Sequence, residues 1–409
     1  MCLLAYESQS VHKMKYTRCS FLSLILFLAL NLEAEIGNGL WRKFDYTDGF
    51  NGINTFNIYE TRDGRMWFGT MNGLYVYDGQ TFKNYTQLDG LPNNNVRGIY
   101  QTRDGKIWLG TMGGLVVFDG HTFETIQAKY VGVWAFHQTD DGNLWITTND
   151  GFCMYDGQQF HHYPIQKDGQ SLGTIEVVED NVGVLWFASV TGGVIKYDGH
   201  TTTVYDEADG LATKDIWNSE KTKDGTLWFG GGFQSNVNGL TNYDGVTFRI
   251  LSTKDGLIDN RVRSSVASKL GGIWLGTDNG ISYCDNTGPT STFTNFLPEV
   301  GLGTRQVLSI YESSDGILWC GGYMGAVGLS QYDPQGLKQY KVIDALGQEL
   351  ADQKVNWILE TDDLHILFGT AKGIAHYRQG AITSRFLVNK EILQLFQSKD
   401  RSIWAFSVD

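Results

Sequence analysis

The chain has 409 residues, of which 42% are hydrophobic, so it is long enough to bury a large core. Its fifty glycines, five prolines and 13% aromatic residues favour short strands joined by tight turns. The formal net charge of −13, with no cluster of Lys and Arg, argues against a nucleic-acid partner, because phosphate binding needs a basic surface.

The N-terminal segment has the order of charged and apolar residues found in secretory signal peptides. Basic residues at positions 13–18 precede an apolar run over residues 21–30, which is too short to cross a bilayer comfortably. We therefore expect residues 1–34 to be a signal peptide, with Met14 as an alternative start. The mature protein is then expected in the periplasm or outside the cell. A buried N-terminal helix is the alternative interpretation.

The rest of the chain is built from nine copies of one repeat. The sequence Asp63-Gly-Arg-Met-Trp-Phe-Gly-Thr70 returns in close copies at residues 104–111, 141–148 and 224–231. A second signature, Tyr-Asp-Gly followed by Phe, comes after most copies, and some copies add Asp-Gly-Leu. Five looser copies are centred on Trp186, Trp274, Trp319, Leu367 and Trp404.

Each repeat of roughly 40 residues predicts four antiparallel strands. In the second copy we expect strands at residues 96–101, 106–111, 115–118 and 122–125. Asp-Gly turns join the first strand to the second and the third to the fourth, because glycine accepts a positive φ. Such a unit is one blade of a β-propeller. The rival architecture, a solenoid, would need shorter repeats stacked in parallel.

The number of copies bounds the number of blades. Residues 41–46 match the fourth strand of a repeat, so they can complete a last blade that supplies only three strands. The chain stops at Asp409, inside the second strand of the ninth unit. We predict an all-β chain in which residues 40–409 form a β-propeller of four-stranded antiparallel blades. It has seven to nine repeat units and seven or eight blades, with a surplus or truncated last unit. We favour truncation, and hence a fragment of a longer protein.

The order of these signatures resembles the two-component regulator propeller repeats over residues 40–409. In that family the repeats form seven-bladed propellers, often two in series, in the extracytoplasmic part of hybrid sensor kinases. Many of them are associated with glycan sensing. Val182 and Leu270 replace the turn Asp here, and Leu367 replaces the Trp. These departures weaken the expected regularity of the blades but leave the fold unchanged.

The topology of a blade divides its loops between two faces of the propeller. The Asp-Gly turns lie on one face, and the loops between strands two and three and between blades lie on the other, which we expect to bind ligand. Aromatic, arginine and amide residues at the start of the inner strands suit a sugar, including an acidic one. The alternative is tryptophans packed between blades and solvated arginines. The candidate ligand-binding residues are Arg97, Trp134, Trp217, Arg261, Arg263, Arg305 and Asn356.

Other repeated residues are expected to be structural. Each repeated Asp precedes a Gly in a two-residue turn, unlike a calcium loop, and His161 and His162 point to opposite faces of a strand. We therefore expect no metal and no cofactor. One Trp per repeat is expected to pack blade against blade. These residues are Trp67, Trp108, Trp145, Trp186, Trp228, Trp274 and Trp319.

Together these features predict the ligand-sensing, non-catalytic propeller of a two-component signalling receptor, outside the cytoplasm and responsive to glycans. Its partners would be a small-molecule or glycan ligand and either a protein or its own C-terminal signalling domains, which could anchor it to a membrane. A secreted scaffold or adhesion propeller is one alternative. A second is an enzyme similar to the streptogramin lyases, for which His137, the one histidine on an inner strand, would need an acidic cluster.

Overall fold

The computed structural model describes most of residues 39–334 and six shorter stretches between residues 355 and 408. The expected signal peptide and the tip of the loop at residues 233–238 lie outside the described residues. The chain divides into a first unit, residues 34–336, and a second, in which the described strands belong to residues 337–409. The described ranges are 39–127, 132–232, 239–285, 291–297, 301–323, 328–334, 355–361, 366–370, 373–378, 381–386, 391–398 and 402–408.

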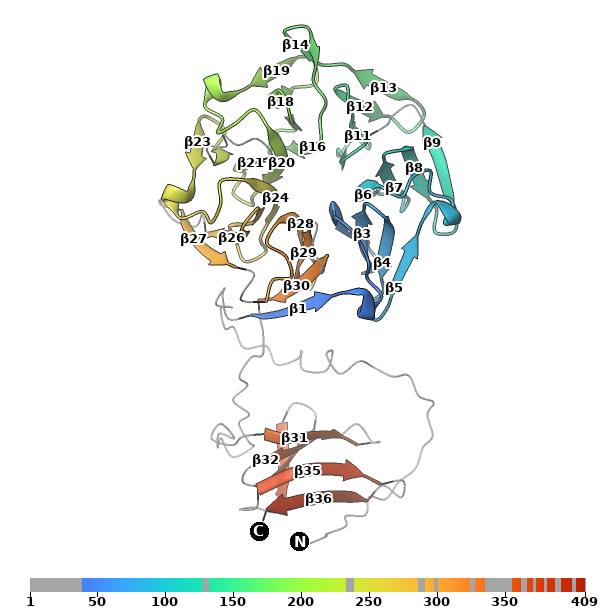
Figure 1. Ribbon diagram of the computed structural model, residues 1–409, viewed down its shortest axis with the longest axis vertical. Coiled ribbons are helices and arrows are strands. Elements are labelled where there is room, and N and C mark those ends of the chain that lie inside the picture. Colours follow the sequence, from blue (N-terminus) through green and yellow to red (C-terminus); the bar gives the residue numbers. More distant parts are fainter. Residues whose placement is uncertain are drawn as a thin grey trace. The chain divides into compact units, whose positions relative to one another are not determined.

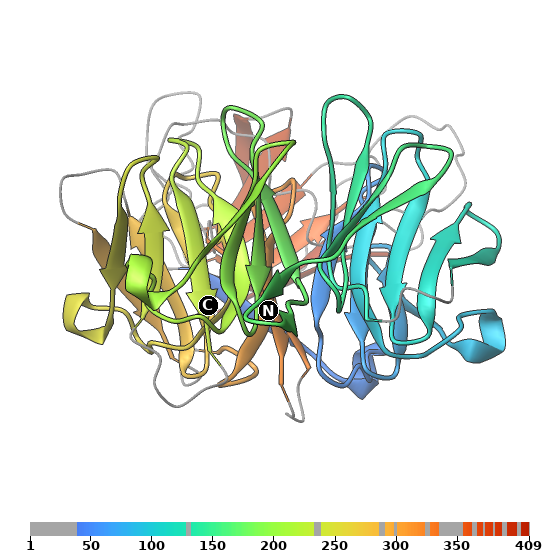
Figure 2. The same ribbon diagram turned by 90° about the horizontal axis from the view of Figure 1, so that it is seen from above.

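The first unit is a ring in which the described residues form seven four-stranded antiparallel sheets arranged around a central axis (Figure 1). This arrangement confirms the predicted all-β propeller. The strands of each blade run between the two faces of the ring (Figure 2). Gly105 and Gly120, with φ of 93° and 101°, make the two turns of the second blade, as the Asp-Gly pairs predicted.

Blades 1 to 7 are numbered in chain order, each beginning with its innermost strand. Blade 1 contains β2 (Asn57–Glu60), β3 (Met66–Thr70), β4 (Gly73–Tyr77) and β5 (Phe82–Tyr85), and blade 2 contains β6 (Val96–Gln101), β7 (Ile107–Thr111), β8 (Gly114–Phe118) and β9 (Phe123–Gln127). Blade 3 contains β10 (Phe136–Gln138), β11 (Leu144–Thr147), β12 (Phe152–Tyr155) and β13 (Phe160–Tyr163), followed by the hairpin β14 (Gln166–Lys167) and β15 (Gln170–Ser171). Blade 4 contains β16 (Glu176–Glu179), β17 (Leu185–Ser189), β18 (Gly193–Tyr197) and β19 (Thr202–Tyr205). Blade 5 contains β20 (Ile216–Lys221), β21 (Leu227–Gly231), β22 (Leu240–Tyr243) and β23 (Phe248–Leu251), and blade 6 contains β24 (Val262–Ala267), β25 (Ile273–Thr277), β26 (Gly280–Asp285) and β27 (Thr292–Phe296). Blade 7 contains β28 (Val307–Glu312), β29 (Leu318–Gly322), β30 (Leu329–Asp333) and β1 (Leu40–Phe44).

The N-terminal strand closes the ring. Strand β1 pairs with β30 over its whole length, from Leu40 opposite Asp333 to Phe44 opposite Leu329. Phe44 is fully buried and stacks on Trp319 with ring centroids 5.4 Å apart. The prediction that an N-terminal fourth strand completes a three-stranded last blade is therefore confirmed.

Neighbouring blades are joined by apolar packing and by polar contacts at the turn face. Trp67 of blade 1 is fully buried against Ile99 and Leu109 of blade 2, and its indole N–H donates to Thr61 Oγ1 at 3.1 Å. At the turns, the Arg62 guanidinium donates across to the Thr102 carbonyl at 2.9 Å. The repeated tryptophan thus stabilises the contact between blades, and each blade depends on its neighbour.

The Asp-Gly-Leu signature marks the chain's entry into the next blade. In the first such loop the Thr86 hydroxyl accepts from the Leu88 N–H, and Asp89 Oδ2 accepts from the Thr86 N–H at 2.8 Å. Gly90 ends the turn with φ of 108°, and Leu91 is buried beyond it. This reciprocal capping fixes the direction of the loop. Such 3₁₀ turns are η1 (Tyr46–Asp48), η2 (Gln87–Asp89), η3 (Glu207–Asp209) and η4 (Thr253–Asp255).

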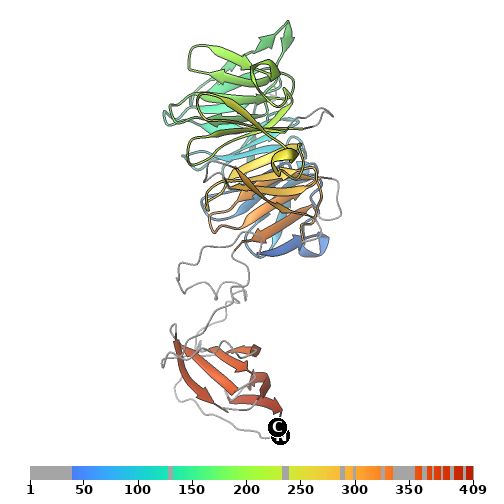
Figure 3. The same cartoon turned by 90° about the vertical axis from the view of Figure 1, so that its left-hand side faces the viewer.

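The second unit holds the eighth and ninth copies of the repeat, as a four-stranded and a two-stranded antiparallel sheet (red in Figure 3). Leu367, Ile374, Ile392 and Leu395 form its buried apolar cluster. The described part of the ring therefore uses seven of the nine copies. The strands of the second unit are β31 (Val355–Glu360), β32 (Ile366–Thr370), β33 (Gly373–Arg378), β34 (Ala381–Phe386), β35 (Glu391–Gln397) and β36 (Ile403–Val408).

Candidate ligand site in the propeller channel

A β-bulge near the start of four inner strands places one extra side chain per blade toward the channel. In blade 2, Val96 pairs with Thr111 and Gly98 pairs with Gly110, which leaves Arg97 as the extra residue. A bulge turns its extra side chain out of the regular alternation of a strand. The corresponding residues of blades 5, 6 and 7 are Trp217, Arg263 and Leu308.

These residues line one pocket of about 330 Å³, to which all seven blades contribute. The size is at the small end of the range of ligand pockets in proteins. Asn54 comes from a loop between blades, and Met71 and Tyr323 come from loops between second and third strands. The pocket therefore reaches the face on which we expected ligand to bind. Of the seven predicted site residues, four line it, namely Arg97, Trp134, Trp217 and Arg263.

Arg97 is held between two aromatic rings. The Cζ atom of its guanidinium lies 3.9 Å from the centroid of Phe56 and 4.2 Å from that of Trp134. Its Nε donates to Asn95 Oδ1 at 2.7 Å. Burial lowers the pKa of Arg97 to about 10, because the surrounding protein replaces the water that would solvate the charge. Two cation–π contacts and one hydrogen bond therefore hold the guanidinium in place.

The two predicted tryptophans meet in the pocket. Trp134 and Trp217 pack edge to face, with ring centroids 5.8 Å apart and an interplanar angle of 79°. The indole N–H of Trp217 donates to Asp215 Oδ1 at 2.6 Å. Both rings also border the apolar cluster between blades 4 and 5. They are thus part of the packing and part of the pocket wall, which combines the two interpretations offered by the sequence.

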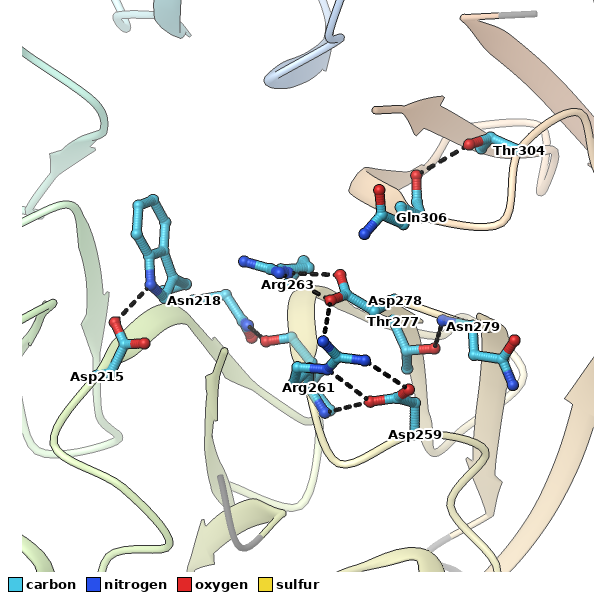
Figure 4. A network of polar contacts seen from close by, with 12 residues as sticks. Asp215, Asn218, Asp259, Arg261, Arg263, Thr277, Asp278, Asn279, Thr304 and Gln306 are labelled. Carbon is cyan, nitrogen blue, oxygen red and sulfur yellow. Dashed lines mark hydrogen bonds and ion pairs between the residues drawn. The ribbon is translucent and has the colours of Figure 1, made fainter. Parts of the chain in front are cut away.

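On the other side of the channel, two arginines converge on one carboxylate (Figure 4). Arg263 makes a bidentate pair with Asp278, with Nε–Oδ1 and Nη2–Oδ2 distances of 2.7 and 2.8 Å. Arg261 Nη1 lies 3.2 Å from Asp278 Oδ2, and Arg261 Nε lies 3.3 Å from Asp259 Oδ1. The hydrogen bond to Asp259 raises the pKa of Arg261. These positive charges are therefore neutralised within blade 6.

Amide and hydroxyl groups also line the pocket. Asn218 donates to the Val262 carbonyl at 2.8 Å and accepts from Ser265 Oγ at 2.7 Å. Three further residues that line the pocket each hold a side-chain oxygen that is buried and has no hydrogen-bond partner among the described residues. Buried polar atoms of this kind are costly unless a partner reaches them. They are Asn57 Oδ1, Ser219 Oγ and Ser264 Oγ.

Two carboxyl groups titrate far above their usual range. Burial raises the pKa of Glu176, a pocket-lining residue of blade 4, to about 8, and the nearby Glu220 charge adds to the effect. Burial likewise raises the pKa of Glu220 in blade 5 to about 7. Because the charged form is disfavoured in both, Glu176 is mostly protonated at neutral pH.

Three predicted residues lie elsewhere. Arg261 borders the pocket through its contact with Asp278 but does not line it. The side chain of Arg305 is exposed, and its backbone carbonyl accepts from the Gly280 N–H at 2.8 Å. Asn356 belongs to β31 of the second unit, and its part in a ligand site stays a prediction.

The candidate residues chosen from the sequence left out several pocket residues, although these stand at or next to the same position of the repeat. Phe56 stands at the aligned position in blade 1, and Glu176 and Ser264 come directly after it in blades 4 and 6. The partner of Arg263, Asp278, comes from a different loop of the same blade. Where blade 2 has Gly-Thr-Met, blade 6 has Gly-Thr-Asp. This difference in the sequence pointed to an acidic partner for Arg263.

The histidines have local partners. His137 Nε2 lies 2.6 Å from Glu179 Oε2, between blades 3 and 4, and His161 Nε2 lies 2.8 Å from Asp156 Oδ2. The His162 ring bonds to the Asp150 carbonyl at 2.7 Å. In the part of the chain that the structure describes, no group of three His, Cys, Asp or Glu side chains is placed to hold a metal ion.

Comparison with known proteins identifies the repeat. The family model described as "Two component regulator propeller" matches residues 49–72 and 90–113. The chain therefore contains two-component regulator propeller repeats, as the resemblance predicted. A stretch of 62 residues, 15% of this chain, is 37% identical to Histidine kinase P4 of Formosa agariphila and covers 4% of that protein.

Solved structures share the fold at low sequence identity. The extracellular domain of BT4673 from B. thetaiotaomicron, described as a one component system, is 16% identical with a TM-score of 0.56, covering 90% of this chain and 51% of that chain. Streptogramin B lyase is 16% identical with a TM-score of 0.57, covering 72% of this chain and 98% of the lyase. The chain thus spans about half the length of the BT4673 domain, and its match to Histidine kinase P4 covers a small part of that protein. Among the described residues, no helix is long and apolar enough to cross a membrane.

Proposed function

We propose that the chain is the ligand-sensing part of a two-component signalling receptor, that it works outside the cytoplasm, and that it responds to a glycan bound in the channel pocket without chemical turnover. The observation that carries this proposal is the pocket itself, where Trp134 and Trp217 present ring surface beside amides, hydroxyls and a guanidinium. Sugars combine apolar faces with many hydroxyls, so they suit such a lining.

The signalling role is supported by the repeat type and by the fold shared with an extracellular domain. Under this proposal residues 1–34 direct export, and a protein partner or further signalling domains of the same protein receive the signal. Ligand binding would change the contacts between blades, because the pocket draws on all seven of them and each blade packs on the next.

The test is calorimetric titration of the full chain with a panel of neutral and acidic oligosaccharides. We expect saturable binding by at least one member, lost in Trp217→Ala and kept in Tyr46→Ala. Tyr46 is a matched control because its side chain is 76% exposed on η1, outside the pocket. Binding that survives Trp217→Ala would place the site elsewhere, and an absence of binding across the panel would contradict a glycan sensor.

The streptogramin-lyase alternative rests on the shared fold, which hosts more than one function. Its histidine candidate, His137, bonds Glu179 and does not line the pocket. Release of a cleaved product from any bound oligosaccharide or cyclic peptide would favour that alternative over a sensor.

A further inference from the structure

We propose that the ligand of the channel pocket carries a carboxylate and that Arg97 binds it, so that the substrate class is an acidic sugar, an oligosaccharide with a uronate residue. This inference rests on the proposed function, which leaves the charge of the ligand open. It is carried by the contrast between Arg97 and the other arginines around the channel.

The first step is that the charge of Arg97 is not balanced by the protein. No ion pair joins it to a carboxylate among the described residues. Its pKa is lowered by burial, and no described carboxylate counteracts this effect. Arg263 and Arg261, in contrast, share Asp278. A partly desolvated charge without a counter-ion is unfavourable, and an anion from solution would relieve that cost.

The second step is the geometry of the guanidinium. The guanidinium lies over the rings of both Phe56 and Trp134, and Asn95 accepts from its Nε. The N–H groups at Nη1 and Nη2 are then the donors left for a ligand, on a guanidinium that three contacts already hold in place. A planar carboxylate can accept two parallel hydrogen bonds from the edge of a guanidinium.

The third step explains why blade 2 lacks an internal partner. In blade 6 the residue after Gly276-Thr277 is Asp278, which neutralises Arg263 of the same blade. In blade 2 the residue after Gly110-Thr111 is Met112, which has no charge. Two blades with an arginine at the same bulge therefore differ in whether their own loop supplies the anion.

The fourth step concerns the rest of the ligand. Amide and hydroxyl residues, among them Asn57, Asn218 and Ser265, line the same pocket as Trp217. A body rich in hydroxyls suits such a polar lining, whereas a fatty acid would desolvate it without making hydrogen bonds. Glu176 adds little negative charge at neutral pH, because burial raises its pKa to about 8.

The test uses matched pairs of neutral oligosaccharides and their uronate counterparts of the gluco, galacto and manno series, together with 6-sulfated hexoses, titrated into the full chain. We expect one uronate to bind at least about tenfold more tightly than its neutral counterpart, the effect of a charge-assisted hydrogen-bond pair. Arg97→Gln should remove this preference. Met112→Asp should also remove it, because the new carboxylate would occupy the guanidinium edge. Arg305→Gln, at an exposed arginine outside the pocket, should leave it unchanged.

The outcomes separate the two proposals. Equal affinity for neutral and acidic members, unaffected by Arg97→Gln, would overturn the carboxylate inference while the glycan sensor stands. Preference for the sulfated sugars over the uronates would replace the carboxylate by a sulfate and overturn the uronate class. Binding of no member at all would overturn both. Circular dichroism and thermal unfolding of each variant verify that it is folded.

Discussion

Arginines at the same bulge position on two sides of the channel differ in whether a carboxylate neutralises them. In blade 6, Arg263 is buried and bound by Asp278 at 2.7 and 2.8 Å, and a second arginine shares that carboxylate. In blade 2, Arg97 stands at the equivalent bulge between two aromatic rings and has no carboxylate partner among the described residues. The difference indicates that the first arrangement stabilises blade 6 internally and that the second is available to a ligand.

Removing the carboxylate of blade 6 should have a severe effect on stability. Asp278→Asn leaves Arg263 buried without its counter-ion, and breaking such a pair by removing one partner costs about 3–5 kcal/mol in free energy of unfolding. Urea unfolding of the full chain measures this. The control is Asp140→Asn, at the exposed Arg103–Asp140 pair of 2.8 Å, for which the expected cost is about 1 kcal/mol or less. Equal losses in the two variants would contradict the structural role of Asp278.

The backbone beside Arg97 should be sensitive to a single methyl group. A Cβ on Gly98 would lie 2.5 Å from the Trp134 carbonyl oxygen, so Gly98→Ala must displace Trp134 and disturb its contact with Arg97. Overpacking of this kind costs about 1–3 kcal/mol, and ligand affinity should fall with it. Ser264→Ala, at the aligned position in blade 6, is the stability control because it adds no atoms. A fully stable Gly98→Ala variant with normal affinity would show that the contact between Trp134 and Arg97 is not needed.

Supplying blade 2 with the carboxylate of blade 6 should couple it to Arg97. In a double-mutant cycle, Met112→Asp and Arg97→Gln are expected to show a coupling energy of about 1 kcal/mol, as contacting residues do. The cycle is measured by thermal unfolding of the four proteins. Strict additivity would mean that residue 112 does not reach the guanidinium, and the explanation of the difference between the blades would be wrong.

The buried carboxyl of blade 4 predicts a smaller, pH-dependent effect. Glu176 has a pKa of about 8 against an ordinary value of 4.5, so the protonated form is favoured by folding. Its contribution to stability is fully present below pH 4.5 and is lost as the pH rises through about 8. The wild-type melting temperature should therefore fall between pH 6 and pH 9 more than that of Glu176→Gln. Parallel curves for the two proteins would contradict the burial of this carboxyl.

The fold could be predicted from the sequence because every blade of the propeller is built from the same short-range turn and strand patterns. The Asp-Gly turns, the repeated Trp and the fourth-strand match of residues 41–46 are all local patterns, and they determine the blade and the closing strand. The repeat continues into the eighth copy, which contains Asn356, so the pattern alone does not show after which copy the ring closes. The pairing of β1 with β30 decides this, and it is a contact between distant segments.

The site could be predicted only as a position in the repeat. Alignment identified Arg97, Trp134, Trp217 and Arg263, but the bulges that present three of them to the channel have no sequence signature of their own. Whether an arginine is neutralised depends on a residue from another loop, as Asp278 shows. Reading the loops together with the strand starts would have separated Arg97 from Arg263.

The most direct test of the account is a crystal structure of the full chain with the tightest-binding uronate oligosaccharide. We expect the sugar in the channel pocket, with its carboxylate oxygens accepting hydrogen bonds from Nη1 and Nη2 of Arg97 and its ring against Trp134 or Trp217. A ligand bound outside the channel, or one whose carboxylate points away from Arg97 into solvent, would contradict it.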